Sequence, residues 1–374
     1  MAVAVPNFQV LARDGAARRG RLSTPHGVVE TPAFMTVGTL AAVKGLTPAQ
    51  LRAHGAQIVL SNTYHLAVRP GETVVRDFGG LAAFMGWHGP TLTDSGGYQV
   101  FSLASRRALS EEGVRFRNHV DGRELFLSPE RALEIQRALG PDLMMVLDVC
   151  PPGNAARDEI RRALELTHAW ARRARTAYED GPGRGGQWLL GIVQGGVHED
   201  LRAESAQRLV ELDFPAYAIG GVAVGEPAEE IERVARFTAA RLPDDRLRYL
   251  MGVGRPQDLL NAIDGGVDIF DCVMPTRHAR HAQAFTRDGT INLKNAAFRD
   301  DHGPLDPECD CEACRTVSRG YIRHLAMARE IMAVVYLTLH NVRFYLHLLE
   351  DVRAAIAGGR YADFRRERLR RLDA

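Results

Sequence analysis

Short apolar segments alternate with helical segments along most of the chain, at intervals typical of a barrel. Each apolar segment ends in polar or glycine residues, and the pattern predicts eight β-strands. These strands are expected over residues 29–37, 57–66, 90–100, 142–150, 187–196, 216–226, 248–254 and 267–275. The intervening segments predict helices, most clearly over 154–180 and 199–213. Eight strand–helix repeats predict an α/β fold of the (β/α)8 barrel type rather than an open, doubly wound sheet.

The predicted barrel spans residues 29–285 and is flanked by two smaller parts. Residues 1–28 are expected to form a small antiparallel β ornament. Residues 286–374 contain three of the five cysteines and a long helical pattern that ends at Gly358-Gly359. We expect this last part to be a helical appendage packed on the barrel.

Composition narrows the class of protein. The chain is 45% hydrophobic and 25% charged, with a formal net charge of +1, so any contact with nucleic acid must come from local basic patches. The N-terminal segment lacks the apolar core of a signal peptide, and no run approaches the roughly 18 apolar residues of a membrane span. Five cysteines without a secretion signal argue against a disulfide framework. We therefore expect a cytoplasmic protein that has no membrane partner and whose thiols are available for metal.

The sequence ECDCEACRT places Cys309, Cys311 and Cys314 within six positions. Three thiolates so closely spaced predict a zinc site, because Zn²⁺ prefers four soft or borderline ligands in a tetrahedron. A site with four protein ligands is closed, and hence structural rather than catalytic. A zinc deaminase is excluded because its H-x-E and P-C-x-x-C elements are missing. Cys150 and Cys272 lie elsewhere and are interpreted as packed thiols.

His340 is the candidate fourth ligand. It lies on the apolar side of the long C-terminal helical pattern, with Leu337 three residues before it and Phe344 four after it. An imidazole there would close the site and pin the helix to the cysteine loop. His324 and His347 remain alternatives on the spacing alone.

Polar or glycine residues follow the apolar part of five predicted strands: Asp94, Asp148, Gln194, Gly220-Gly221 and Asp271. The carboxyl ends of barrel strands form the active site, so we expect these residues to converge. Any one aspartate could instead cap a helix, but Asp148 and Asp271 lie between apolar neighbours, where an unpaired carboxylate is costly. Together with Tyr98, this set suits a planar, hydrogen-bonding ligand, and its carboxylates suit exchange of a glycosidic bond.

Five motifs resemble those of the tRNA-guanine transglycosylases. They are TDSGGYQVFSLA (93–104), GIVQGG (191–196), GGVAVGE (220–226), FDCVMPTRHARHAQAF (270–285) and CDCEACRTVSRGYIRHL (309–325). The similarity spans nearly the whole chain, keeps the family order of motifs and looks most like the bacterial, queuosine-pathway branch. It implies a transferase that exchanges guanine 34 of tRNAs with a GUN anticodon, those for Asp, Asn, His and Tyr, for the 7-deazaguanine preQ1.

The resemblance also implies roles for individual residues. Asp271 becomes the nucleophile on C1′ of the ribose, and Asp94 becomes the general acid/base. The base would be recognised by Asp148, Gln194 and the backbone at Gly221, between the stacking walls Tyr98 and Met251. The anticodon loop would be held by Arg255, Arg277 and Arg280. One structural zinc per subunit would be held by Cys309, Cys311, Cys314 and His340.

Three valines bear on the identity of the incoming base. Val149 stands where the family has glutamate and Val222 where it commonly has leucine, whereas Val224 resembles the preQ1-using branch more than the enlarged queuine pocket. A queuine-salvaging variant therefore stays open. A non-catalytic tRNA-binding subunit is a second alternative, but such partners lose active-site carboxylates that this chain keeps as Asp94 and Asp271. A hydrolytic glycosidase on the same barrel is a third. The resemblance also implies a homodimer, and the basic tail at 365–374 is interpreted as a solvated helix end, with tRNA contact as the alternative.

Overall fold

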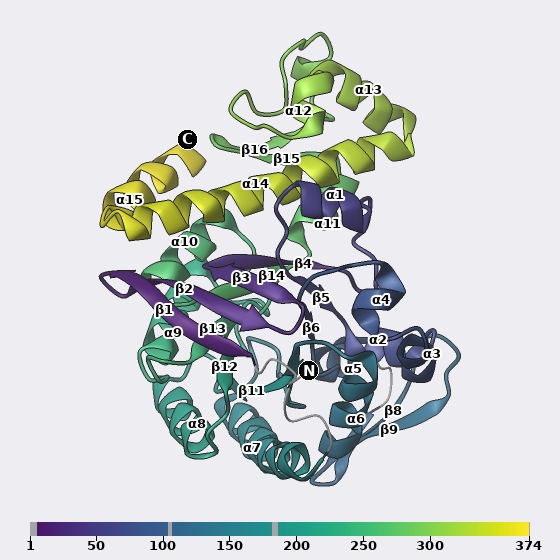
Figure 1. Ribbon diagram of the computed structural model, residues 1–374, viewed down its shortest axis with the longest axis vertical. Coiled ribbons are helices and arrows are strands. Elements are labelled where there is room, and N and C mark those ends of the chain that lie inside the picture. The colour runs from purple at the N-terminus through teal and green to yellow at the C-terminus, as the bar shows by residue number, and fades with distance from the viewer. Residues whose placement is uncertain (1–5, 104–106, 182–185, 374) are drawn as a thin grey trace.

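Eight parallel strands close into a barrel, and each overlaps one of the expected segments (Figure 1). The computed structural model describes residues 6–103, 107–181 and 186–373. Around the barrel the strands follow chain order, with the last pairing back onto the first: β4 (Ala33–Val37), β5 (Val59–Ser61), β6 (Thr91–Thr93), β10 (Leu143–Met145), β11 (Trp188–Val193), β12 (Ala216–Ile219), β13 (Leu247–Leu250) and β14 (Ile269–Cys272). Almost every strand residue is buried, because side chains fill the interior and helices cover the outside.

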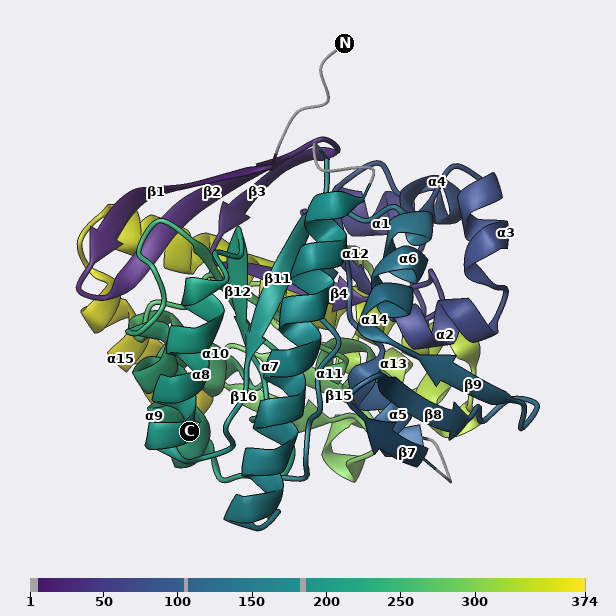
Figure 2. The ribbon, with the colours of Figure 1, turned by 90° about the horizontal axis from the view of Figure 1, so that it is seen from below.

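The predicted helices form the outer layer. Figure 2 shows four of them around β11 and β12: α6 (Pro129–Leu139), α7 (Arg157–Asp180), α8 (Glu199–Glu211) and α9 (Ala228–Ala239). Local sequence fixes the ends of α6. Ser128 accepts a hydrogen bond from the Arg131 amide, Pro129 occupies the first turn, and Gly140 ends the helix in the left-handed conformation at φ 71°. The remaining barrel helices are α1 (Pro48–Ala53), α2 (Thr63–Val68), α3 (Glu72–Asp77), α4 (Leu81–Met85), α5 (Gly97–Leu103) and α10 (Pro256–Asp264).

The N-terminal ornament is an antiparallel sheet of β1 (Asn7–Asp14), β2 (Ala17–Thr24) and β3 (Gly27–Thr31). It continues to Thr31, past the expected limit at residue 28, because Val29 packs in the core beneath the sheet. Arg18 of β2 is fully buried and forms an ion pair with Asp268, directly before β14. Because Asp268 precedes its strand, this contact ties the sheet to the amino-terminal end of the barrel, away from the strand ends that carry the candidate site.

A second sheet was not predicted. It consists of β7 (Arg107–Ser110), β8 (Gly113–Arg117) and β9 (Glu124–Leu127), and it lies between α5 and α6. All four residues of β7 are exposed, so the segment lacks the apolar run that identified the barrel strands. In the described part of the chain, no helix combines the length and the apolar character needed to cross a membrane.

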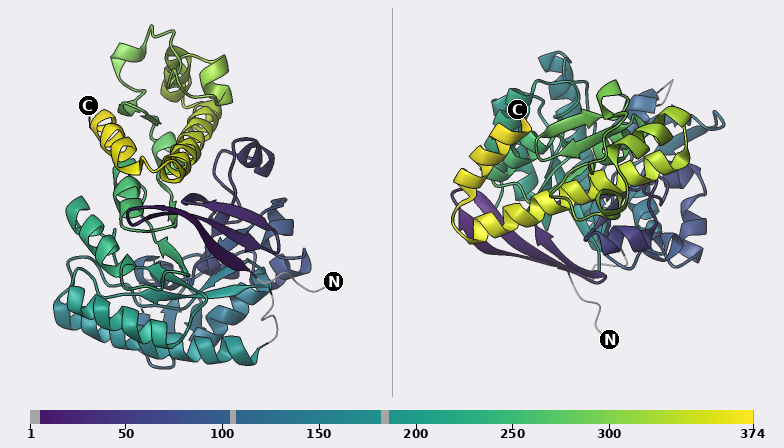
Figure 3. Two further views of the ribbon diagram at one scale, coloured as in Figure 1. Left: turned by 60° about the vertical axis from the view of Figure 1, so that its left-hand side comes forward. Right: turned by 90° about the horizontal axis from the view of Figure 1, so that it is seen from above.

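The C-terminal part is built on one long helix, α14 (Ile331–Ala357), which ends at Gly358 as expected. Figure 3 shows α14 crossing the molecule, with α15 (Tyr361–Leu372) folded back at its end. Smaller elements pack around it: α11 (Met274–Arg280), β15 (Gln283–Thr286), β16 (Gly289–Asn292), η1 (Ala296–Phe298), α12 (Glu312–Thr316) and α13 (Arg319–Ala328). In α15, Arg368 pairs with Asp351 and Arg371 with Asp288, so part of the basic tail is neutralised within the chain.

Candidate active site and metal centre

The structure brings the strand-end residues together around one cavity of about 310 Å³. Its wall includes one residue at or near the end of each of six consecutive barrel strands, β6 and β10 to β14: Asp94, Asp148, Gln194, Gly221, Met251 and Asp271. Tyr98 on α5 also lines the cavity and is 53% exposed, so it is a wall of the site rather than a core side chain. The convergence expected from a barrel is thus observed, with the carboxylates of residues 94 and 271 in the same cavity.

Asp271 is held by two donors. The Tyr249 hydroxyl lies 2.6 Å and the Gly252 amide 2.8 Å from the same oxygen, Oδ1. Among the described residues no side chain donates to Oδ2, which is therefore the oxygen available to a ligand. Burial raises the pKa of Asp271, and the two hydrogen bonds oppose that rise. Burial and the neighbouring Asp271 also raise the pKa of Tyr249 well above its usual value, so its hydroxyl stays protonated as a donor.

Asp94 has a different environment. Its Oδ2 accepts hydrogen bonds from Asn62 Nδ2 at 2.5 Å and Gln99 Nε2 at 2.8 Å, and its Oδ1 accepts the Thr63 amide at 2.8 Å. Burial raises the pKa of Asp94 to about 6, outweighing these donors, and the nearby Asp271 adds to the rise. A carboxyl group that titrates near neutral pH can both accept and return a proton under physiological conditions.

Asp148 and Gln194 form a linked pair beside Gly221. Asp148 accepts hydrogen bonds from Gln194 Nε2 at 2.7 Å and Ser95 Oγ at 3.1 Å, and burial raises its pKa to about 6. Gly221 has φ +64°, and a Cβ atom there would come within 2.1 Å of Gln194 Oε1, so only glycine fits. A carboxylate acceptor beside amide donors complements the edge of a heterocycle that carries both donors and an acceptor.

Five contacting residues were missed by the sequence analysis: Asn62, Thr63, Ser95, Gln99 and Tyr249. Asn62 directly follows β5, and the strand-end rule that identified the other residues would have found it. Tyr249 lies inside β13, where an aromatic residue is indistinguishable from core. Its chemical role appears only once β13 is placed beside β14.

The three arginines predicted to hold RNA are exposed, and one of them lines the cavity. Arg277 of α11 lines it, Arg280 lies one turn further along α11, and Arg255 precedes α10. None of the three forms an ion pair with any other residue that the structure describes, which leaves their charges available to an anionic ligand. Cys150 and Cys272 also line the cavity, but burial raises their pKa values to about 12 and about 11, so both are protonated thiols and not nucleophiles.

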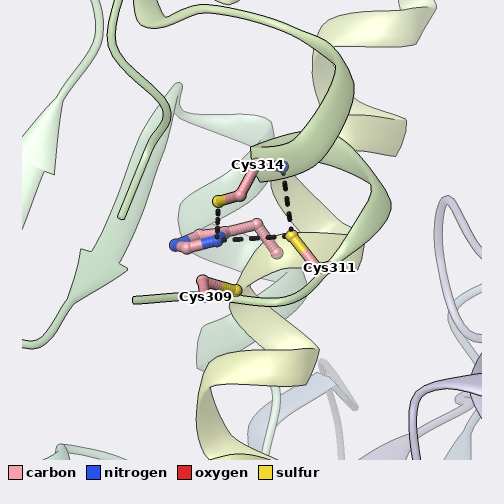
Figure 4. A group of neighbouring side chains, drawn as sticks. Cys309, Cys311 and Cys314 are labelled. Atoms are coloured by element: carbon pink, nitrogen blue, oxygen red, sulfur yellow. Dashed lines mark hydrogen bonds between the residues drawn. The ribbon is translucent and has the colours of Figure 1, made fainter. Parts of the chain in front are cut away.

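The predicted metal ligands converge as a Cys3His cluster. The side-chain donor atoms of Cys309, Cys311, Cys314 and His340 all lie within 4.8 Å of one another. Figure 4 shows the three labelled cysteines directed toward one imidazole ring; His340 Nδ1 lies 3.3 Å from Cys314 Sγ and 3.7 Å from Cys311 Sγ.

The orientation of the His340 ring fits a metal ligand. Its Nε2 lies 2.7 Å from the Phe285 carbonyl and so carries the hydrogen, which leaves the Nδ1 lone pair facing the thiols. The rival histidines lie elsewhere: His347 contacts Arg287 and Asp351, and His324 is exposed. The donor set is that of a closed, tetrahedral site, and zinc is the ion it suits best.

Comparison with known proteins agrees with this geometry. The sequence profile of the family described as "Queuine tRNA-ribosyltransferase" matches residues 14–374. The chain is 53% identical over 351 residues to the queuine tRNA-ribosyltransferase of Bacillus subtilis (strain 168), covering 94% of this chain and 91% of that protein. It is 52% identical over 367 residues to the protein of that name from Pelotomaculum thermopropionicum, covering 98% of both. The protein of that name from Francisella tularensis subsp. novicida is 47% identical over 363 residues. The chain belongs to the queuine tRNA-ribosyltransferase family.

Proposed function

We propose that this protein, a pentosyltransferase by its family, exchanges guanine 34 for preQ1 in tRNAs with a GUN anticodon, those for Asp, Asn, His and Tyr. The observation that carries the proposal is the shared cavity of Asp271 and Asp94, which have different hydrogen-bond partners there. The exchange needs one carboxylate that attacks the sugar and another group that moves a proton. The tRNA substrate makes the cytoplasm the expected compartment.

The proposed reaction is a double displacement. Asp271 Oδ2 attacks C1′ of ribose 34, a C1′–O bond forms, and the C1′–N9 bond breaks with its electron pair passing to guanine. The leaving guanine takes up a proton from the protonated Asp94 carboxyl group, which becomes a carboxylate. Asp94 then removes the proton from N9 of the incoming base, whose nitrogen attacks C1′ and releases the Asp271 carboxylate. Two inversions give net retention, and no redox or nucleotide cofactor is needed because one glycosidic bond replaces another.

Base recognition is assigned to Asp148, Gln194 and the Gly221 backbone, with Tyr98 and Met251 stacking on the ring faces. The Asp148 carboxylate suits the N–H and amino donors of a guanine-like edge, and the amides of the other two residues suit its carbonyl oxygen. The cavity wall also contains Val222, Val224 and Cys150, and a branched valine side chain leaves less room than glycine would. A narrow wall favours the small aminomethyl group of preQ1 over the bulkier substituent of queuine.

The exposed Arg255, Arg277 and Arg280 are proposed to hold phosphates and bases of an extruded anticodon loop, since none of them forms an ion pair with the described residues. The zinc ion is proposed to be structural, one per subunit. A homodimer is also proposed. It is supported by exposed apolar side chains near the turn between α13 and α14, of which Ile331 is 78% and Met327 55% exposed. Sedimentation at micromolar concentration tests the dimer, and a monomer at all concentrations would contradict it.

The experiment that tests the reaction measures incorporation of labelled guanine, preQ1 and queuine into a transcript with a GUN anticodon. Incorporation of labelled guanine, with preQ1 as the better competitor, supports the proposal. Preferred use of queuine would favour a salvage enzyme. Tight tRNA binding without any incorporation would favour a non-catalytic subunit, and release of free guanine without an acceptor base would indicate a hydrolase.

A further inference from the structure

Arg202 of α8 is fully buried, yet its guanidinium forms no ion pair with the residues that the structure describes. It donates instead to four backbone carbonyls: Nε to Gly196 at 2.6 Å, Nη1 to Val193 at 3.4 Å, and Nη2 to Gly220 at 2.8 Å and Gly221 at 3.1 Å. Burial lowers the pKa of Arg202 to about 9. The charge of Glu226 opposes this lowering without forming a direct ion pair. A buried guanidinium without a direct ion pair is costly, which implies that its carbonyl contacts matter.

The four carbonyls belong to the two loops that carry the base-recognition groups. Val193 and Gly196 bracket Gln194 at the end of β11, whereas Gly220 and Gly221 follow β12. One guanidinium thus bridges adjacent strand ends from the helix side of the barrel. The cavity lies on the other side of the same loops and is lined by Gln194, Gly220 and Gly221.

The contact between Arg202 and the Gly220 carbonyl also fixes the direction of the next backbone N–H, that of Gly221. The carbonyl and the N–H of one trans peptide point in opposite directions. Because the Gly220 carbonyl is held by Arg202, the Gly221 N–H of the same peptide points away from Arg202, toward the cavity. A hydrogen bond from the Gly221 amide lowers the pKa of the Cys150 thiol, against the larger raising effect of burial. Because Cys150 belongs to the cavity wall, this contact agrees with an amide that points toward the cavity.

The glycines of these loops do not hold the conformation by themselves. Gly195 has φ +134° and Gly221 has φ +64°. Glycine adopts these angles easily, but many other backbone conformations are equally open to it. A Cβ atom at Gly195 would lie 2.9 Å from Arg202 Cγ, so the arginine stem packs directly on the loop. The donors of Arg202 select one of the states that the glycines allow.

We propose that Arg202 is a positioning residue that holds the Gly221 N–H toward the carbonyl oxygen of the bound base and thereby sets selectivity for a base with an oxygen acceptor at that position. The inference rests on the proposed function and deepens it. Arg202 does not touch the substrate; it acts through the peptide of Gly220 and Gly221 and through the loop of Gln194.

The test compares Arg202→Met and Arg202→Lys with a matched control, Arg208→Met. Arg208 lies on the same helix, but it is only partly buried and pairs with Glu165 and Glu204, away from the carbonyls. For each variant, the affinity for tRNA, KM and kcat for labelled guanine, and inhibition by 6-thioguanine are measured. That analogue keeps the ring N–H and the amino group of guanine and replaces the oxygen by sulfur, a weak acceptor.

We expect Arg202→Met to raise KM for guanine about tenfold, the effect of losing one well-placed hydrogen bond, with tRNA affinity and kcat near those of Arg208→Met. Inhibition by 6-thioguanine should weaken much less, so the preference for oxygen over sulfur falls. Arg202→Lys, with fewer donors in a less rigid array, should give an intermediate loss.

Equal losses for the two bases, or behaviour like Arg208→Met, would overturn the inference. If Arg202→Met does not fold, Arg202→Lys decides, and an unchanged preference in it overturns the inference equally. Absence of guanine incorporation by the unaltered protein would instead refute the proposed function itself.

Discussion

The hydrogen bond from Tyr249 to Asp271 offers a direct test of the nucleophile. Tyr249 is 1% exposed, and its hydroxyl lies 2.6 Å from Asp271 Oδ1. Tyr249→Phe removes this single oxygen and keeps the ring that packs in the barrel. The Gly252 amide, 2.8 Å from the same carboxylate oxygen, remains as a donor. The substitution therefore weakens the stabilisation of the Asp271 anion with little change in shape.

The expected size follows from the charge on the acceptor. A hydrogen bond to an ionised group contributes about 1.5–3 kcal/mol, which corresponds to about one to two pKa units. The Tyr249 hydroxyl lowers the pKa of Asp271 against the larger raising effect of burial, so its removal raises the pKa further. The ionised fraction of the nucleophile then falls at acid and neutral pH. At alkaline pH the carboxylate is again ionised, and with one donor fewer it is at least as nucleophilic.

The assay is kcat/KM for guanine incorporation between pH 5 and 9. We expect the acid limb of the Tyr249→Phe profile to move up by about one to two pH units, with a plateau close to that of the parent protein. Tyr217→Phe is the matched control: Tyr217 is also 1% exposed but lies in β12 and has no contact with Asp271. A uniform loss of rate at every pH, or the same shift in the control, would refute the reasoning.

Three further predictions follow from the same geometry. Asp271→Ala should abolish labelled-guanine incorporation while tRNA binding, measured by filter retention, persists; normal turnover would disprove the nucleophile assignment. Asp148 has a folded-state pKa of about 6 against an ordinary 3.8, so its contribution to stability is present below about pH 3.8 and is lost as pH rises through 6. The melting temperature of Asp148→Asn should therefore rise relative to that of the parent protein between pH 4 and pH 8, by the equivalent of at most about 3 kcal/mol. A difference in melting temperature that stays constant over this pH range would contradict the raised pKa. Chelation of the metal, or His340→Ala, should lower the melting temperature and release about one zinc per chain; full stability without metal would show that the ion is not structural.

The barrel could be predicted from sequence because each strand is a buried apolar run. Such a run can be recognised in the sequence without knowing which strands it pairs with. The sheet of β7, β8 and β9 could not be predicted in this way. All four residues of β7 are exposed, and β8 and β9 are short strands in which buried and exposed residues are mixed, so none of the three is a buried apolar run. The boundary of the N-terminal sheet at residue 28 was also not predictable from local sequence. β3 and β4 form one apolar segment in the sequence, and they separate at Thr31 only because β3 pairs with β2 whereas β4 joins the barrel.

The site shows the same division. Asp94, Asp148 and Asp271 stand out because a carboxylate next to an apolar run is locally anomalous. Tyr249 is locally ordinary, and it acquires its role through register: it pairs with Ile269, two residues before Asp271, on the strand next door. Side chains two residues apart on a strand share a face, so the pairing directs the hydroxyl toward the carboxylate at the strand end. A hydrogen-bond partner of this kind can be identified only when the pairing of the barrel strands is known.

The Cys3His cluster proposed to bind zinc can influence the active site without contacting the reacting atoms, because α14 connects the two. His340 holds the Phe285 carbonyl through Nε2, and the next residue, Asn341, accepts the Phe285 amide and donates to the carbonyls of Pro275 and Gln283. Pro275 belongs to α11, the helix of Arg277 and Arg280, two of the three arginines proposed to hold RNA. A metal that fixes His340 therefore fixes the register of α14 against α11. Its loss should weaken tRNA binding before it alters the chemistry of the bound base.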